Sequence, residues 1–135
     1  MAIKNPYQAY QTNSVTTASP GELTLMLYNG CLKFLHLGKK AIEEGNVQEK
    51  NTNIQKAQNI IQEFMVTLNM DVPMSKNLQL LYDYMYRQLI SANVKSDKAI
   101  LEEVEEMVVE LRDTWKQAIQ LNRQQQHGSV QGGQV

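Results

Sequence analysis

Few side chains in this sequence are suited to acid–base, nucleophilic or metal chemistry, because it contains only two histidines and one cysteine. A di-metal centre between helices needs Glu-x-x-His pairs that face inward from two of them. Lys33 instead stands three positions before His36, and His127 lies in a glycine-rich stretch near the carboxyl end. No ligand set can be assembled from these residues, so we expect neither a metal site nor a cofactor.

Cys31 is the remaining candidate for chemistry, as a nucleophile. A catalytic cysteine needs a neighbouring base and a third group that orients that base. One helical turn to either side, the sequence has apolar and aromatic residues instead, namely Leu27, Tyr28, Phe34 and Leu35. These neighbours favour a small buried side chain in a packed helix. We therefore expect a protein that is not an enzyme and has no catalytic residues.

The densest charged run is EEVEE at residues 102–106. Negative side chains in the first turns of a helix are stabilised by the helix macrodipole. A solvated helix face is the favoured interpretation of this run, and an acidic recognition patch is the alternative.

Composition and charge restrict the class of protein further. The 135 residues carry 13 basic and 14 acidic side chains, so a net charge of −1 provides no general attraction to nucleic acid. The single cysteine excludes an internal disulfide, which favours a reducing compartment. Neither a signal peptide nor a stretch of about 20 apolar residues is present. We expect a cytoplasmic protein without membrane insertion.

The elements that would position any functional residue are helices. Ser19, Pro20 and Glu22 form a capping signal for the first of them, and Gly45 is a stop signal. No alternating strand pattern with a hairpin turn is present. The predicted helices span residues 20–44, 47–70, 74–93 and 97–121.

Apolar spacing and short links predict an all-α fold, an antiparallel four-helix bundle on which a short N-terminal segment packs. We expect three parts, which are an N-terminal lid segment (residues 1–18), the helical bundle (residues 19–121) and a disordered Gln- and Gly-rich tail (residues 122–135). The inner face of the last helix is predicted to contain Ile100, Val104, Met107, Leu111 and Ala118.

More apolar residues are present than four inward stripes need. The first helix has apolar residues around most of its circumference, and the last has Leu101, Val108, Trp115 and Ile119 beside its predicted inner stripe. Seven methionines add side chains that repack around varied partners. Such an excess indicates a groove or an interface; the alternative is a thicker core closed by the N-terminal segment.

Several short strings, taken in order, resemble the flagellar secretion chaperones of the FliS family. They run from residue 5 to about residue 120 and are NPYQAY, VTTASPGEL, MLYNG, KAQNII, NL, LYDYM, AN, EEV and LRxxW. The resemblance implies a cytoplasmic export chaperone that binds the disordered C-terminal region of flagellin. It further implies prevention of premature flagellin polymerisation and delivery to the type III export gate.

The resemblance also implies roles for individual residues. Tyr7 and Tyr10 match an apolar pair of the N-terminal segment, which covers the substrate groove and contributes to docking on the export gate protein. The partner-binding groove is expected on the first helix, at Leu23, Met26, Leu27, Tyr28, Leu32 and Leu35.

Two other functional classes compete with this interpretation. In a generic dimeric helical adaptor, the spare apolar faces would pack against a second copy, and a homodimer is also possible for a chaperone. A bundle hydrolase or metal oxidase would need the catalytic sets that the sequence lacks.

Overall fold

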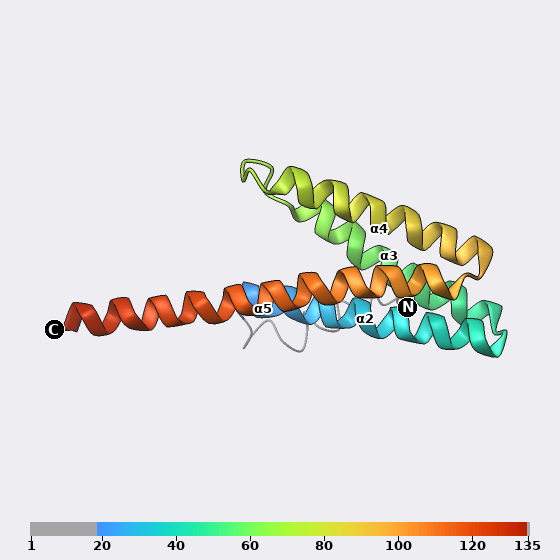
Figure 1. Cartoon of the computed structure of the whole chain (residues 1–135), viewed down its shortest axis with the longest axis horizontal. Helices are drawn as coiled ribbons and strands as arrows, with labels where there is room; N and C mark the ends of the chain where they lie inside the picture. The colour runs from blue at the N-terminus through green and yellow to red at the C-terminus, as the bar shows by residue number, and fades with distance from the viewer. Residues whose placement is uncertain (1–18, 135) are drawn as a thin grey trace, which may run out of the picture.

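The computed structural model describes residues 19–134, with side chains as far as residue 124. In this part of the chain Figure 1 shows α2 and α5 lying antiparallel, while α3 and α4 form a second antiparallel pair inclined to the first. This arrangement confirms the all-α class and the packing of helices into a bundle. The four helices span Pro20–Glu44 (α2), Val47–Thr67 (α3), Ser75–Lys95 (α4) and Lys98–Gln134 (α5).

The two ends of α2 lie where the sequence signals place them. The Ser19 hydroxyl accepts a hydrogen bond from the Glu22 backbone N–H at 3.2 Å, which satisfies one free donor of the first turn. Gly45 ends the helix with φ of 69°, a left-handed conformation that glycine adopts without steric cost. Asn46 then caps α3, because its side chain accepts from the Glu49 N–H at 3.1 Å.

The link between α3 and α4 differs from the expected one. α3 ends at Thr67 rather than near residue 70, and α4 begins at Ser75. Asn69 organises the link, since its side chain accepts from the Asp71 N–H at 3.0 Å and its carbonyl accepts from the Ser75 hydroxyl at 2.6 Å. Asparagine bonds of this kind compete with helix continuation, which explains the earlier end.

The last helix is longer than expected. The predicted end near residue 121 is wrong, because α5 continues to Gln134. Residues 122–126 contain one arginine and three glutamines, which are good helix formers, and extending an existing helix needs no new nucleus. Figure 1 shows this part of α5 projecting beyond the other helices. A break in the helix therefore does not mark the expected boundary between bundle and tail.

One hydrophobic core joins the helices. Its completely buried side chains come from all four helices and include Leu35, Ile61, Leu89 and Val104. The core-facing side of α5 differs from the predicted one. Leu101 and Val108, expected beside the inner stripe, are completely buried, whereas Ala118 is exposed. Ile100, Met107 and Leu111 of the predicted stripe still pack against the core, so α5 buries a wider face than expected because α2 and α4 both pack against it.

Lys50 holds the turn between α4 and α5. This α3 side chain is 6% exposed, and its Nζ donates to the Asn93 carbonyl at 2.8 Å and to the Ser96 Oγ at 2.7 Å. Ser96 ends α4 with a φ of 50°, which is unusual for a residue other than glycine. The cation also lies at the negative end of the α4 dipole, so Lys50 stabilises both the cap and the turn.

We predict that Lys50→Met lowers the free energy of unfolding by about 1–3 kcal/mol, because the Asn93 carbonyl and Ser96 hydroxyl lose their buried donor. Urea unfolding followed by circular dichroism measures the change. Lys40→Met is the matched control, since Lys40 is exposed on α2. Equal stability of the two variants would contradict the assigned role of Lys50.

Candidate functional site

The structure places Cys31 where it cannot act as a nucleophile. Its side chain is completely buried, and burial raises the pKa of the thiol to about 12. Because the thiolate is the reactive form, this cysteine is inert in the folded chain. Among the side chains that the structure describes, residues 19–124, no group of three or more is arranged to hold a metal ion.

Tyr28 takes part in a buried aromatic cluster. Its hydroxyl lies 2.7 Å from that of Tyr82, and the Phe64 ring lies 4.6 Å from the Tyr28 ring and 5.5 Å from the Tyr82 ring. Burial raises the pKa of both tyrosines, so both hydroxyls stay protonated. The cluster joins α2, α3 and α4, which makes Tyr28 part of the core.

The six residues expected to line a groove on α2 do not lie together. Half of this set belongs to the core, namely Leu27, Tyr28 and Leu35. Leu23, Met26 and Leu32 are half-buried. Leu23 and Leu32 are nine positions apart, and at 100° per residue they lie on opposite sides of the helix. The three half-buried residues therefore belong to two different surfaces, and the partner-binding role of the six residues stays a prediction.

Leu23 and Met26 form the first of these surfaces. Unlike Leu32, neither is among the half-buried residues that pack against the core cluster. Both lie in the first two turns of α2, at the end of the bundle where Figure 1 shows α3 and α4 diverging from α2 and α5. We call Leu23 and Met26 the α2 entry surface.

The first turn of α2 is attached to α5 by polar and apolar contacts. The Trp115 indole N–H donates to the Gly21 carbonyl at 2.9 Å, and Arg123 forms an ion pair with Glu22 at 2.8 Å. A Cβ on Gly21 would lie 3.4 Å from the Ile119 side chain, so α5 passes close to this backbone. These contacts fix the position of Ser19, from which residues 1–18 extend.

The second surface is a shallow groove between α2 and α5, with a volume of about 450 Å³. We call it the α2–α5 groove. Its lining consists of Leu32, Val109, Glu105, Glu106 and Glu110. It combines aliphatic side chains with acidic ones.

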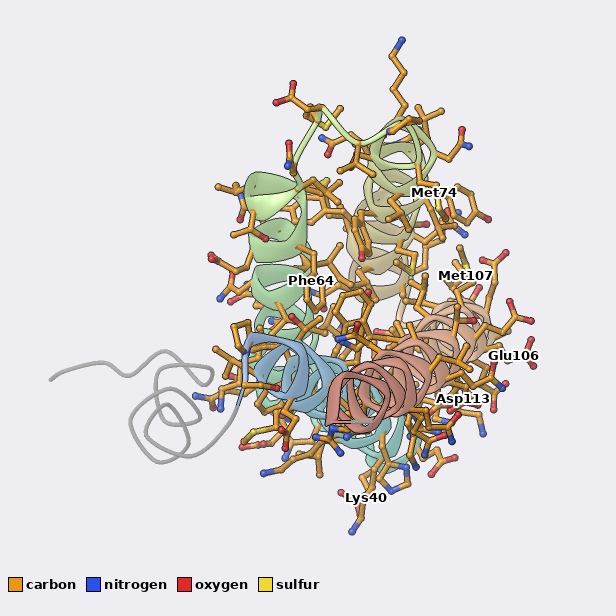
Figure 2. All side chains as sticks on the ribbon, turned by 90° about the vertical axis from the view of Figure 1, so that its left-hand side faces the viewer. Lys40, Phe64, Met74, Glu106, Met107 and Asp113 are labelled. Carbon is orange, nitrogen blue, oxygen red and sulfur yellow. The ribbon has the colours of Figure 1, made fainter. Side chains whose placement is uncertain are left out.

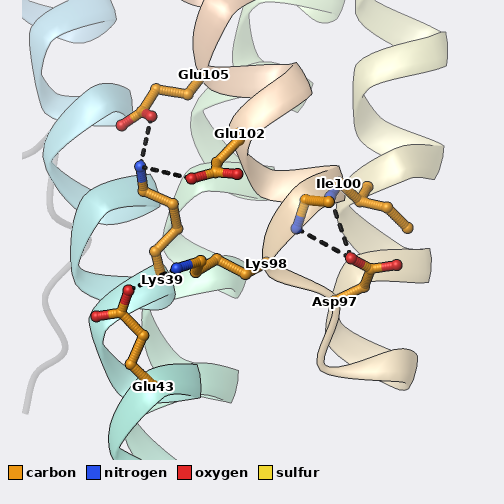
Figure 3. Close-up of polar contacts among 8 residues, drawn as sticks. Lys39, Glu43, Asp97, Lys98, Ile100, Glu102 and Glu105 are labelled. Atoms are coloured by element: carbon orange, nitrogen blue, oxygen red, sulfur yellow. Dashed lines mark hydrogen bonds and ion pairs between the residues drawn. The ribbon is translucent and has the colours of Figure 1, made fainter.

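Two lysines form ion pairs between α2 and α5 beside this groove. Figure 3 shows Lys39 of α2 between two carboxylates of α5, at 2.7 Å from Glu105 and 4.0 Å from Glu102. In the same figure Lys98 pairs with Glu43 at 2.8 Å. Lys39 thus compensates two carboxylates in the first turns of α5, while Lys98 of α5 compensates Glu43 of α2, and Glu102 and Glu105 belong to a structural contact between the two helices.

Sequence reasoning missed the exposed apolar residues of α4. Leu80 is 68% exposed, Ile90 is 42% exposed and Val94 is 81% exposed. Leu80 and Ile90 stand next to the core-packed Leu81 and Leu89, so periodicity alone could have placed these two on the outer face. Tyr7 and Tyr10, assigned to the lid and to export-gate docking, lie outside the described residues, as does the whole expected lid segment (residues 1–18).

Comparison with known proteins identifies the family. The model of the family described as flagellar protein FliS matches residues 3–122. The chain is 59% identical over 129 residues to the flagellar secretion chaperone FliS of Bacillus subtilis (strain 168), which covers 96% of this chain and 97% of that protein. This chain belongs to the FliS family. The resemblance found in its sequence strings is thereby confirmed.

More distant relatives agree with this membership. The flagellar secretion chaperone FliS of Vibrio cholerae is 35% identical over 121 residues, covering 85% of this chain and 89% of that protein. A crystal structure of a flagellar chaperone from bacteria matches with a TM-score of 0.71 at 20% identity, covering 85% of this chain and 95% of that one. At this identity the structural match shows the fold alone.

Membership of the FliS family accounts for the character of the site. The family consists of chaperones rather than enzymes, so surfaces and not reacting groups are its functional parts. In the described part of the chain, no helix combines the length and the apolar content needed to cross a membrane.

The buried thiol predicts a loss of stability at alkaline pH. The pKa of Cys31 is about 12 in the folded chain and near 8.5 when unfolded. A raised folded pKa contributes stability that is complete below the unfolded pKa and decreases as the pH rises toward the folded value. Between pH 7 and pH 9.5 the contribution should fall by about 1.4 kcal/mol.

Urea unfolding at these two pH values measures the effect, with Cys31→Ala as the control that lacks the thiol. The variant should lose less stability than the native chain over the same interval. An equal loss in both proteins would contradict the assignment to Cys31.

Proposed function

We propose that this chain binds the disordered C-terminal region of flagellin in the cytoplasm, prevents its premature polymerisation and delivers it to the flagellar type III export gate. The observation that carries the proposal is the 59% identity, over 96% of the chain, to a flagellar secretion chaperone. The described residues support it through a bundle that leaves apolar side chains outside its core.

A disordered partner that folds on binding matches these surfaces physically. A terminal flagellin segment that forms an amphipathic helix would otherwise pack against further copies of itself. Docking the apolar face of such a helix on the chaperone covers the surface that drives association. The α2 entry surface is suited to this role, because Leu23 and Met26 can be covered without disturbing the core.

The first test substitutes polar side chains for the two apolar ones of the α2 entry surface. We expect Leu23→Gln with Met26→Gln to weaken binding of a flagellin C-terminal peptide about tenfold or more, equivalent to about 1.4 kcal/mol, because apolar area is lost from the interface. Titration calorimetry measures the affinity, and a negative heat-capacity change should accompany binding to the native chain.

Val94→Gln is the matched control, because Val94 is 81% exposed on α4. It should leave the affinity unchanged. Full-length flagellin and flagellin without its C-terminal region binding equally well would refute the proposed partner. Size exclusion with light scattering, with and without the peptide, distinguishes the chaperone from a dimeric adaptor.

We further propose that residues 1–18 act as a lid that carries Tyr7 and Tyr10 and docks on the export gate once flagellin is bound. Contacts of Trp115 and Arg123 fix the start of α2, so the segment extends from a defined point. Tyr10 is nine residues from Ser19, a span of about 30 Å when extended. That reach includes the α2 entry surface.

The lid proposal predicts whether deleting the lid raises or lowers the affinity for flagellin. If the lid must leave before flagellin binds, its docking free energy is subtracted from the observed affinity. Removing residues 1–12 should therefore leave binding of the C-terminal peptide unchanged or tighter, while export is impaired. Tyr7→Ala with Tyr10→Ala is the milder variant. A loss of affinity beyond about tenfold in peptide titration would place the tyrosines in the binding surface and reject the lid.

A further inference from the structure

The α2–α5 groove presents aliphatic side chains between acidic ones. Leu32 packs against the core cluster from α2, and Val109 of α5 is half-buried opposite it. Because these two residues are only partly covered, the floor of the groove is an apolar surface open to solvent. The groove has room for an aliphatic side chain of a second protein, since its volume is about 450 Å³.

Charge around the groove is not balanced within the described residues. Glu105 is paired with Lys39, whereas Glu106 and Glu110 make no ion pair with any side chain between residues 19 and 124. They stand four residues apart on α5, where like charges repel and slightly destabilise the helix. Figure 2 shows Glu106, with Asp113 below it, projecting from the outer side of α5. A cation placed here would relieve the repulsion.

The same charges exclude several occupants. A second copy related by two-fold symmetry would bring its own Glu106 and Glu110 against these residues, and like charges across an interface are unfavourable. Nucleic acid and anionic lipid surfaces are repelled for the same reason. The remaining match is a polypeptide that combines an aliphatic side chain with basic ones.

We propose that the α2–α5 groove binds an amphipathic helix of a partner protein, with an aliphatic residue between Leu32 and Val109 and a Lys or Arg beside it paired with Glu106 and Glu110. Residues three or four apart in such a helix lie on one face, so a single turn supplies both groups. Leu32 lies on the opposite side of α2 from Leu23, so this site is separate from the α2 entry surface. The proposal for this groove does not depend on whether the chain binds flagellin.

The test uses two synthetic amphipathic helices with identical leucine positions, one with lysines beside the leucine stripe and one with glutamates there. The full chain should bind the lysine peptide about tenfold tighter or more at low salt, and added salt should reduce the difference. Fluorescence anisotropy measures the affinities. Amide chemical shifts of the labelled chain should change at Leu32 and Val109.

Glu106→Lys with Glu110→Lys should abolish or reverse the preference for the lysine peptide. Glu44→Lys with Asp71→Lys changes the net charge equally at exposed positions elsewhere and should retain it. Circular dichroism checks that both variants are folded. The proposal is overturned if both variants keep the preference, if both lose it equally, or if the shift changes map to α4.

Discussion

Side chains of α3 and α5 both pack closely against the α2 backbone at Gly38, and the arrangement of these three helices depends on this contact. A Cβ at this position would lie 3.2 Å from the Ile54 side chain of α3 and 3.4 Å from the Leu101 side chain of α5. Glycine therefore lets the α2 backbone pack against both neighbours at once. Because both side chains are completely buried, a larger residue would have to displace parts of the core.

The closed end of the bundle lies near this contact. α2 turns into α3 at Gly45, and Lys50 of α3 bonds to the turn between α4 and α5. Toward the other end the buried Tyr28, Phe64 and Tyr82 cluster still joins α2 to α3 and α4, and beyond it Figure 1 shows the two helix pairs separating. At this open end the bundle leaves Leu23 and Met26 of α2 half-buried and Leu80 of α4 exposed while it keeps a stable core.

The pairing of charged side chains also changes along the length of the bundle. Lysines from α2 and α5 neutralise carboxylates near the turns, where the Lys39 and Lys98 pairs join the two helices. Farther along α5 the carboxylates of Glu106 and Glu110 are left without ion pairs among the described side chains. A chain of net charge −1 can thus present a locally acidic surface. The net charge determines the long-range attraction between the whole chain and a partner. Local recognition depends instead on which charged side chains are already paired.

The sequence by itself determined the helices and the family, and the tertiary structure decided which side chains are surface. Both ends of α2 follow from Ser19 and Gly45, because caps and turns act through bonds to residues a few positions away. No sequence signal marks the role of Gly38, where a Cβ would lie only 3.2 Å from the buried Ile54 side chain. The predicted inner face of α5 missed Leu101 and Val108. Burial depends on how each helix is rotated against its neighbours, and that rotation is set by packing between residues far apart in the chain.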